Sequence, residues 1–267
     1  MKYRLIVSDI DGTLVNSNRQ IAERTKLAIG QFQSLGGVFA IATGRIEQSA
    51  RKYYDELQLN SPAILYNGAK IVELADNKCL LENVLEEEHF TKAVKLLAEM
   101  DCSAIVYSNG KAYVRQMNDT IRAYMEKDSV LCIQVDDFIS CIEGKPNKIL
   151  IIGNDSIFRK FMDAFESICS VKPNTVKSEA EYLEILPRNT SKGEALKNLA
   201  ELLEIPMEQV AAAGDNMNDY EMLKVAGLGI AVSNAAPKLL DAADLIAKSN
   251  DEDGIAEIIE RIIAGDL

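Results

Sequence analysis

Histidine is almost absent from this chain of 267 residues, and its scarcity excludes more classes of function than any other count. With His89 as the only histidine, sites built from several histidines are impossible, including metalloprotease motifs. A Ser-His-Asp triad would have to use this one residue. Three glutamates precede His89, so we expect it to lie in a solvent-exposed helix start.

Cysteine is scarce, and its spacing shows no pairing. The five cysteines stand at positions 79, 102, 132, 141 and 169, and no two of them form a Cys-x-x-Cys pair. Because the number is odd and the spacing is not that of a zinc site, we expect neither a disulfide scaffold nor structural zinc, and predict buried free thiols.

Positive charge and long apolar runs are also limited. The 29 lysines and arginines face 41 acidic residues, giving a net charge of −12 with no basic run. We therefore predict neither a nucleic-acid partner nor binding to anionic lipid. The longest apolar stretches, such as 149–152, are far shorter than the about 20 residues that span a bilayer. The N-terminus lacks the pattern of a secretion signal, and we expect a cytoplasmic protein.

Short strands and helices alternate at both ends of the chain. Apolar runs at 4–8, 38–42 and 63–66 are separated by helical patterns at 21–35 and up to about 57. This order predicts a doubly wound parallel sheet. The same rhythm returns after Pro187, with strands expected at 210–213, 228–232 and 245–247.

The middle of the chain has a different pattern. Asn109-Gly110 lies between two alternating runs, which is a strong hairpin signal. We predict an α/β fold with a Rossmann-like core domain formed by residues 1–83 and 187–267. An α+β domain is expected to be inserted at 84–186.

Two carboxylates, Asp9 and Asp11, follow the first predicted strand directly. Ligands of open α/β sheets bind at the carboxyl ends of strands. Residues two apart in an extended chain point to the same side, and Gly12 lets the backbone turn sharply. Like charges at this spacing repel unless a cation or a shared proton compensates them, and Mg²⁺ suits oxygen ligands. A solvated turn explains the pair equally well when it is taken alone.

A second acidic cluster, at 214–219, follows another predicted strand. Asp215 could complete a metal site, while Asn218 and Asp219 could hold its ligands by hydrogen bonds. Helix capping by Asp215 or Asn216 is the structural alternative, and the two roles can coexist.

Two further segments have features of anion sites. Thr43-Gly44-Arg45 closes the second strand and is expected to start a helix, whose free N–H groups would bind an anion, although a plain cap explains it alone. Ser191-Lys192-Gly193 opens another helix. Because a lysine there opposes the helix dipole, we predict that Lys192 pairs with a phosphate or with Asp9.

These four segments, in this order, resemble the four motifs of the haloacid dehalogenase superfamily. Asn67-Gly68-Ala69 and the segment 182–185 are similar to its Cof-type subfamily, class IIB, which is sugar-phosphatase-like. The resemblance implies that 84–186 is a C2-type cap that closes over the site and selects the leaving group. It also implies a Mg²⁺-dependent hydrolase of phosphomonoesters, acting on sugar phosphates or cofactor phosphates.

The resemblance further implies a role for each motif residue. Asp9 would be the nucleophile that forms an aspartyl-phosphate, and Asp11 the general acid and then the general base. The metal would be held by the Asp9 carboxylate, the Asp11 backbone carbonyl and Asp215, with Asp219 supporting this shell. The phosphate and substrate would be bound by a set of five residues, namely Thr43, Gly44, Arg45, Lys192 and Asn218.

Two other functions fit the same motifs. A phosphotransferase or phosphomutase would use the same Asp9 intermediate, and no residue distinguishes it from a hydrolase. A non-catalytic regulator that binds a metabolite would be expected to lose a motif residue, and the chain departs from the pattern at none of these positions. The expected partner is a small phosphorylated substrate, and the sequence leaves open whether the protein is a monomer or a dimer.

Overall fold

The computed structural model describes all residues from 1 to 267 and divides them into two compact units. The first, called the core unit, comprises Met1–Gly44, Ala50–Leu81 and Ser191–Leu267. The second, the cap unit, comprises Glu82–Thr190 together with the short segment Arg45–Ser49. The cap unit is thus inserted into a core unit that both ends of the chain build.

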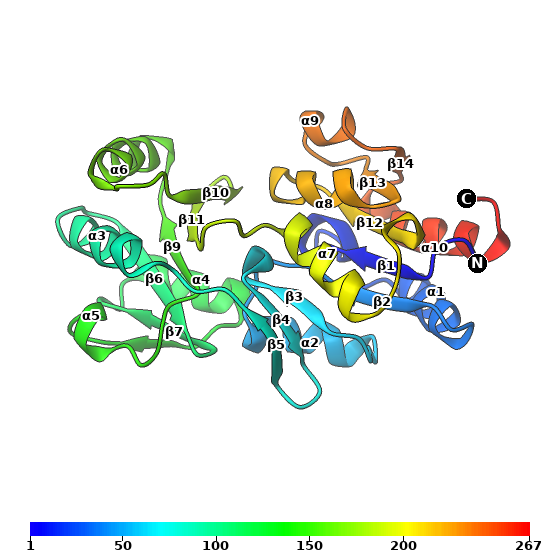
Figure 1. The fold of residues 1–267 in the computed structure, drawn as a ribbon, viewed down its shortest axis with the longest axis horizontal. Coiled ribbons are helices and arrows are strands. Elements are labelled where there is room, and N and C mark those ends of the chain that lie inside the picture. Colours follow the sequence, from blue (N-terminus) through cyan, green and yellow to red (C-terminus); the bar gives the residue numbers. More distant parts are fainter. The chain divides into compact units, whose positions relative to one another are not determined.

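The core unit contains a five-stranded parallel sheet in the order β14-β13-β12-β1-β2 (Figure 1). Its strands are β1 (Leu5–Ser8), β2 (Val38–Ile41), β12 (Val210–Gly214), β13 (Leu228–Val232) and β14 (Leu245–Ala247). All residues of β1 and β12 are buried, as expected for continuous apolar runs with helices on both faces of the sheet. The predicted α/β class with a doubly wound core is confirmed.

Six helices lie wholly or mostly in the core unit. They are α1 (Glu23–Ser34), α2 (Glu47–Glu56), α7 (Lys192–Leu202), α8 (Tyr220–Val225), α9 (Pro237–Leu240) and α10 (Gly254–Ala264). Helix α1 packs against α10, and α7 against α8. Helix α10 ends at Gly265, whose φ of 82° gives the left-handed C-cap that glycine favours.

The third predicted strand belongs to a different sheet. β3 (Ala63–Leu65) pairs antiparallel with β4 (Lys70–Glu73), and β5 (Lys78–Glu82) completes this small sheet. An isolated bridge between Ala42 and Ile64 links β3 to the end of β2. This bridge is parallel, so β3 follows β2 in the predicted direction. β3 is not a full strand of the parallel sheet, because the chain reverses at Tyr66–Gly68 and supplies β3 with an antiparallel neighbour.

The cap unit is built on a six-stranded sheet in the order β10-β11-β9-β6-β7-β8. Its strands are β6 (Ser103–Ser108), β7 (Lys111–Val114), β8 (Cys132–Gln134), β9 (Lys148–Ile152), β10 (Asn174–Glu179) and β11 (Tyr182–Leu186). Its helices are α3 (Glu87–Ala98), α4 (Asp119–Asp128), α5 (Phe138–Cys141) and α6 (Asp155–Ile168). β6 and β7 form the predicted hairpin around Asn109-Gly110.

One face of the cap sheet carries the hydrophobic core of this unit. Ile149 and Ile151 of β9 pack there with Phe161 and Phe165 of α6. The opposite face has Lys148 and Leu150 from the same strand, because side chains alternate along it.

Two predictions about scarce residues were wrong. His89 is buried rather than exposed, since α3 turns it toward Phe165 and its ring contacts both Glu86 and the carbonyl of Val171. All five cysteines are free, as expected, but Cys79 and Cys141 are exposed and the other three are half-buried. None of the helices has both the length and the apolar character needed to span a membrane.

Candidate active site

Three loops of the core unit meet at the carboxyl edge of its parallel sheet. Ser8, the last residue of β1, is in register with Ala213 of β12 and with Ile41 of β2. The next residue, Asp9, donates its N–H to the carbonyl of Ala213 at 2.9 Å. The register therefore brings Asp9 beside the residues that follow β12, although some two hundred residues separate them in sequence.

Lys192 lies at the centre of this edge. Ser191 caps α7 by accepting a hydrogen bond from the N–H of Glu194, which places Lys192 in the first turn. The side chain of Lys192 is 0% exposed, and its Nζ donates to Asp9 Oδ1 and to Asp219 Oδ1, each at 2.6 Å. The predicted pairing of Lys192 with Asp9 is confirmed, and Asp219 is a second partner.

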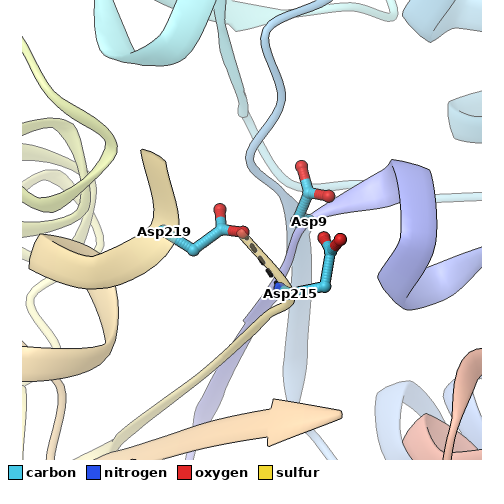
Figure 2. Close-up of side chains that lie close together, drawn as sticks. All are labelled: Asp9, Asp215 and Asp219. Atoms are coloured by element: carbon cyan, nitrogen blue, oxygen red, sulfur yellow. Dashed lines mark hydrogen bonds between the residues drawn. The ribbon is translucent and has the colours of Figure 1, made fainter. Parts of the chain in front are cut away.

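Asp9, Asp215 and Asp219 form a carboxylate cluster (Figure 2). Each offers an oxygen, and these oxygens all lie within 4.8 Å of one another. Asp219 is held in place because its Oδ2 accepts hydrogen bonds from the N–H groups of Asp215 and Asn216, both at 3.1 Å. Asn216 and Asp219 together form a capping box, so the capping alternative is also correct and coexists with the cluster.

The absence of a side chain at Gly12 leaves space for the carboxylate of Asp215. Gly12 has a φ of 78°, and a Cβ at this position would lie 2.5 Å from Asp215 Oδ2. Thr13 donates its hydroxyl to Asp215 Oδ1 at 3.1 Å, and Asn234 donates to the carbonyl of Gly12 at 2.8 Å. Sequence reasoning assigned no role to Thr13 or Asn234. Thr13 stands within the first motif, whereas nothing in the sequence signals Asn234.

Burial and mutual repulsion perturb the charges of the cluster. Burial raises the pKa of Asp9 well above its usual value, against the opposing effect of Lys192. Burial and the charge of Asp219 raise the pKa of Asp215 to about 7. Burial lowers the pKa of Lys192, but Asp219 and Asp9 outweigh that effect and raise it overall, so the ammonium stays charged. Asp11 is half-buried, and its charge also raises the pKa of both Asp9 and Asp215.

This donor set fits a divalent cation with a preference for oxygen ligands. Three carboxylates face one ammonium, so the cluster holds more negative than positive side chains. Mg²⁺ binds through one or two carboxylates and keeps several waters, which a cluster of this size allows. The cluster lies at the helical turn that follows β12, with Asp219 fully buried.

The segment Thr43-Gly44-Arg45 differs from its prediction. Helix α2 begins only at Glu47, and the N–H of Thr43 is donated to the carbonyl of Ile64 at 2.9 Å. The predicted helix N-terminus at 43–45 was therefore wrong, because the neighbouring strand uses this N–H. Arg45 belongs to the cap unit, where its guanidinium lies 3.6 Å from Asp128.

Asn218 lies beside Asn67. Its Nδ2 donates to Asn67 Oδ1 at 3.1 Å, although 151 positions separate the two residues. Its Oδ1 is buried and has no hydrogen-bond partner. Sequence reasoning placed Asn218 near the phosphate and noted the segment 67–69 only as part of a resemblance.

Comparison with known proteins shows the family to which the chain is similar. Residues 6–259 match the family model described as haloacid dehalogenase-like hydrolase. The chain is similar to the putative phosphatase YxeH of Bacillus subtilis, at 30% identity over 98% of each chain.

Solved structures show the same fold. A haloacid dehalogenase-like hydrolase from Bacteroides thetaiotaomicron superposes with a TM-score of 0.90 and 31% identity, covering 98% of this chain and all of that one. A subclass IIB sugar phosphatase superposes with a TM-score of 0.83, covering 97% and 98% of the two chains, and its 18% identity shows the fold alone. The family resemblance is thereby confirmed.

Proposed function

Because the chain belongs to the haloacid dehalogenase-like hydrolase family and resembles proteins named phosphatases, we propose that it is a Mg²⁺-dependent phosphomonoesterase using Asp9 as nucleophile. Its substrates are small phosphorylated metabolites, either sugar phosphates or cofactor phosphates. The single observation that carries this proposal is the buried contact of Lys192 with both Asp9 and Asp219, beside Asp215.

The positive charge of Lys192 addresses the first obstacle to the reaction. A phosphomonoester dianion and a carboxylate nucleophile repel each other, and a buried ammonium 2.6 Å from Asp9 offsets this repulsion. Asp9, Asp215 and the backbone carbonyl of Asp11 would hold Mg²⁺. When bound, the cation neutralises charge on the phosphoryl oxygens and on the clustered carboxylates.

The reaction proceeds in two displacements. A carboxylate oxygen of Asp9 forms a bond to phosphorus while the ester P–O bond breaks, and Asp11 gives its proton to the leaving oxygen. Water then attacks the phosphorus of the aspartyl-phosphate and passes a proton to Asp11. The bond between phosphorus and Asp9 breaks, so inorganic phosphate is released and the carboxylate of Asp9 is regenerated. Thr43, Gly44 and Lys192 bind the phosphoryl oxygens, with Asn218 close by.

Specificity is assigned to the cap unit. Glu82–Thr190 acts as the cap that closes over the site and selects the leaving group, and Arg45 lies at the substrate entrance. Within the cap unit, the guanidinium of Arg45 lies 3.6 Å from Asp128 at the end of α4.

Phosphate release from p-nitrophenyl phosphate with Mg²⁺, and its loss with EDTA, tests this function. We expect Asp9→Asn to reduce kcat by at least about 10⁴-fold, because the amide is not a nucleophile. Asp55→Asn is the matched control, since Asp55 is exposed on α2. Normal turnover by Asp9→Asn, or none by the wild type on a broad panel of phosphomonoesters, contradicts the proposal.

A phosphorus NMR assay with an acceptor sugar distinguishes hydrolysis from phosphoryl transfer. Hydrolysis gives inorganic phosphate alone, whereas a phosphotransferase gives a new phosphate ester. Formation of that ester as the main product would replace the hydrolase assignment while keeping Asp9 as the nucleophile.

A further inference from the structure

Three consecutive residues after β3 have left-handed backbone conformations. Tyr66, Asn67 and Gly68 have φ values of 52°, 53° and 100°. Asparagine and glycine tolerate this region, but a bulky residue such as Tyr66 adopts it only at an energetic cost. Strain of this kind persists where the surrounding structure enforces it, commonly at functional sites. All three residues are buried.

The reversal contacts the loops that carry the motif residues. The N–H of Asn67 donates to the carbonyl of Thr43 at 2.9 Å, and its side-chain Oδ1 accepts from Asn218. A Cβ on Gly44 would lie 3.0 Å from Asn67 Nδ2, so the amide of Asn67 lies directly against this glycine.

Gly68 contacts the third of these loops. A Cβ on Gly68 would lie 2.2 Å from the carbonyl oxygen of Ser191, the residue before Lys192. One reversal of three residues therefore braces the Thr43–Gly44 loop, the Asn218 turn and the start of α7. The left-handed backbone allows residues 66–68 to contact all three of these segments.

The amide of Asn218 has one end paired and one end without a partner. Asn67 occupies its Nδ2, and the buried Oδ1 is left without a partner. A buried acceptor without a hydrogen bond is costly, so a group that carries an O–H would fit there. The oxygens of a phosphate dianion carry no hydrogen, whereas water and the hydroxyl groups of a polyol do.

We propose that Asn67 is a positioning residue of the phosphoryl-transfer site, holding Asn218 so that its Oδ1 accepts a hydrogen bond from an O–H group. This inference rests on the proposed function. The O–H belongs either to the attacking water or to a hydroxyl of the leaving group next to the phosphate. In this role Asn67 acts through Asn218, whose Nδ2 donates to Asn67 Oδ1.

Asn67→Gly is the variant that tests this role, because glycine keeps the left-handed backbone while removing the amide. We expect kcat/KM to fall by about 10- to 100-fold, the usual loss when a positioning contact is removed. Asn77→Gly is the matched control. Asn77 is also left-handed, with a φ of 58°, but it lies in the exposed turn between β4 and β5.

A double-mutant cycle shows whether Asn67 acts through Asn218. If it does, Asn218→Ala should remove most of the same activity, and adding Asn67→Gly should cost little more. Losses that multiply in the double variant would overturn the proposal. So would wild-type activity of Asn67→Gly.

Two substrates distinguish the sources of the O–H group. An equal loss on p-nitrophenyl phosphate, whose leaving group has no hydroxyl beside the phosphate, and on glucose 6-phosphate identifies the attacking water. A loss confined to glucose 6-phosphate identifies a hydroxyl of the leaving group. Either result supports the role of Asn67.

Asn67→Asp keeps the proposal testable even if the glycine variant fails to fold. Aspartate also tolerates a positive φ and retains an acceptor for Asn218, but it adds a charge that repels a phosphate dianion. We expect a raised KM, and an unchanged KM would overturn the placement of Asn67. The two proposals can fail independently. Absence of turnover by the wild type contradicts the proposed function, whereas the variants test the role of Asn67.

Discussion

Each unit of the molecule buries a lysine against carboxylates, and the two sites differ in charge balance. In the core unit, Lys192 faces Asp9 and Asp219, with Asp215 close by. In the cap unit, Lys148 of β9 lies 3.2 Å from Glu184 of β11, and both side chains are 4% exposed.

The cap pair is closely balanced. Ser178 donates a hydrogen bond to Glu184 Oε1 at 2.8 Å, and the ammonium of Lys148 lies 5.0 Å from the centre of the Tyr107 ring. Burial raises the pKa of Tyr107 well above its usual value, so that ring stays uncharged. The core site, by contrast, holds several carboxylates for one ammonium. Excess charge of one sign is therefore what distinguishes a ligand site from a structural pair.

Removing the core lysine should have the largest effect of any change at these two lysine sites. We expect Lys192→Met to lower kcat/KM by about 10³-fold with Mg²⁺ present, because the phosphoryl oxygens lose a buried positive charge. Lys197→Met provides the control on the same helix, since Lys197 forms a half-exposed pair with Glu194. If Lys192→Met were as active as Lys197→Met, Lys192 would have no catalytic importance, and its site would not differ in function from that of Lys148.

Removing the cap lysine should act on stability instead. Lys148→Met leaves the Glu184 charge buried without its ammonium, and we expect the free energy of unfolding to fall by about 3–5 kcal/mol. Urea denaturation measures this loss. Replacing both partners, with Lys148→Met and Glu184→Leu, should restore most of it.

Lys127→Met is the matched exposed control in the cap unit. Lys127 pairs with Glu179 at 2.6 Å, but both side chains are more than a third exposed. Its loss should cost at most about 1 kcal/mol. An equal cost for Lys148→Met would show that the buried pair contributes no more than an exposed one.

The last expected effect concerns pH and Mg²⁺. The pKa of Asp215 is raised from 3.8 to about 7, so the metal-free folded state holds a proton that the unfolded state releases between these values. Its stability contribution is therefore present at low pH and is lost as pH rises toward 7. Above pH 7 the ionised cluster gains most from a cation.

Thermal denaturation with and without Mg²⁺ checks this dependence. Saturating Mg²⁺ should raise the Tm by about 5 °C at pH 8, equivalent to about 2–3 kcal/mol, and by less at pH 5.5. Asp215→Asn should abolish the difference between the two pH values. An identical rise at both pH values in the wild type would contradict the assignment of Asp215 to the metal site.

The sequence predicts the motif strands and the pairing of Lys192 well, because both follow from short-range pattern. Continuous apolar runs identify β1 and β12, and each ends directly before an aspartate. Parallel pairing then brings Asp9 and Asp215 to one edge without further information. A lysine in the first turn of a helix, against the dipole, indicates that a carboxylate or phosphate is nearby.

Other features depend on contacts between distant segments and so escaped prediction. His89 follows three glutamates, yet its burial is set by packing against α6. No helix starts at Thr43, because its N–H donates a hydrogen bond to the carbonyl of Ile64. Ile64 belongs to β3, a strand of the small antiparallel sheet. The role of Asn67 requires knowing that Asn218 lies beside it, and no local pattern carries that information.

The strand order has a consequence for biosynthesis. β1 is made first, yet its neighbour β12 begins at Val210, after the entire segment Glu82–Thr190 has been translated. While the ribosome is still elongating, the cap sheet can therefore form before Asp9 of the core unit acquires its carboxylate neighbours. A chain that ends between Asp9 and Asp215 carries Asp9 but cannot assemble the acidic cluster, so under the proposed function we expect truncated products to be inactive from the start.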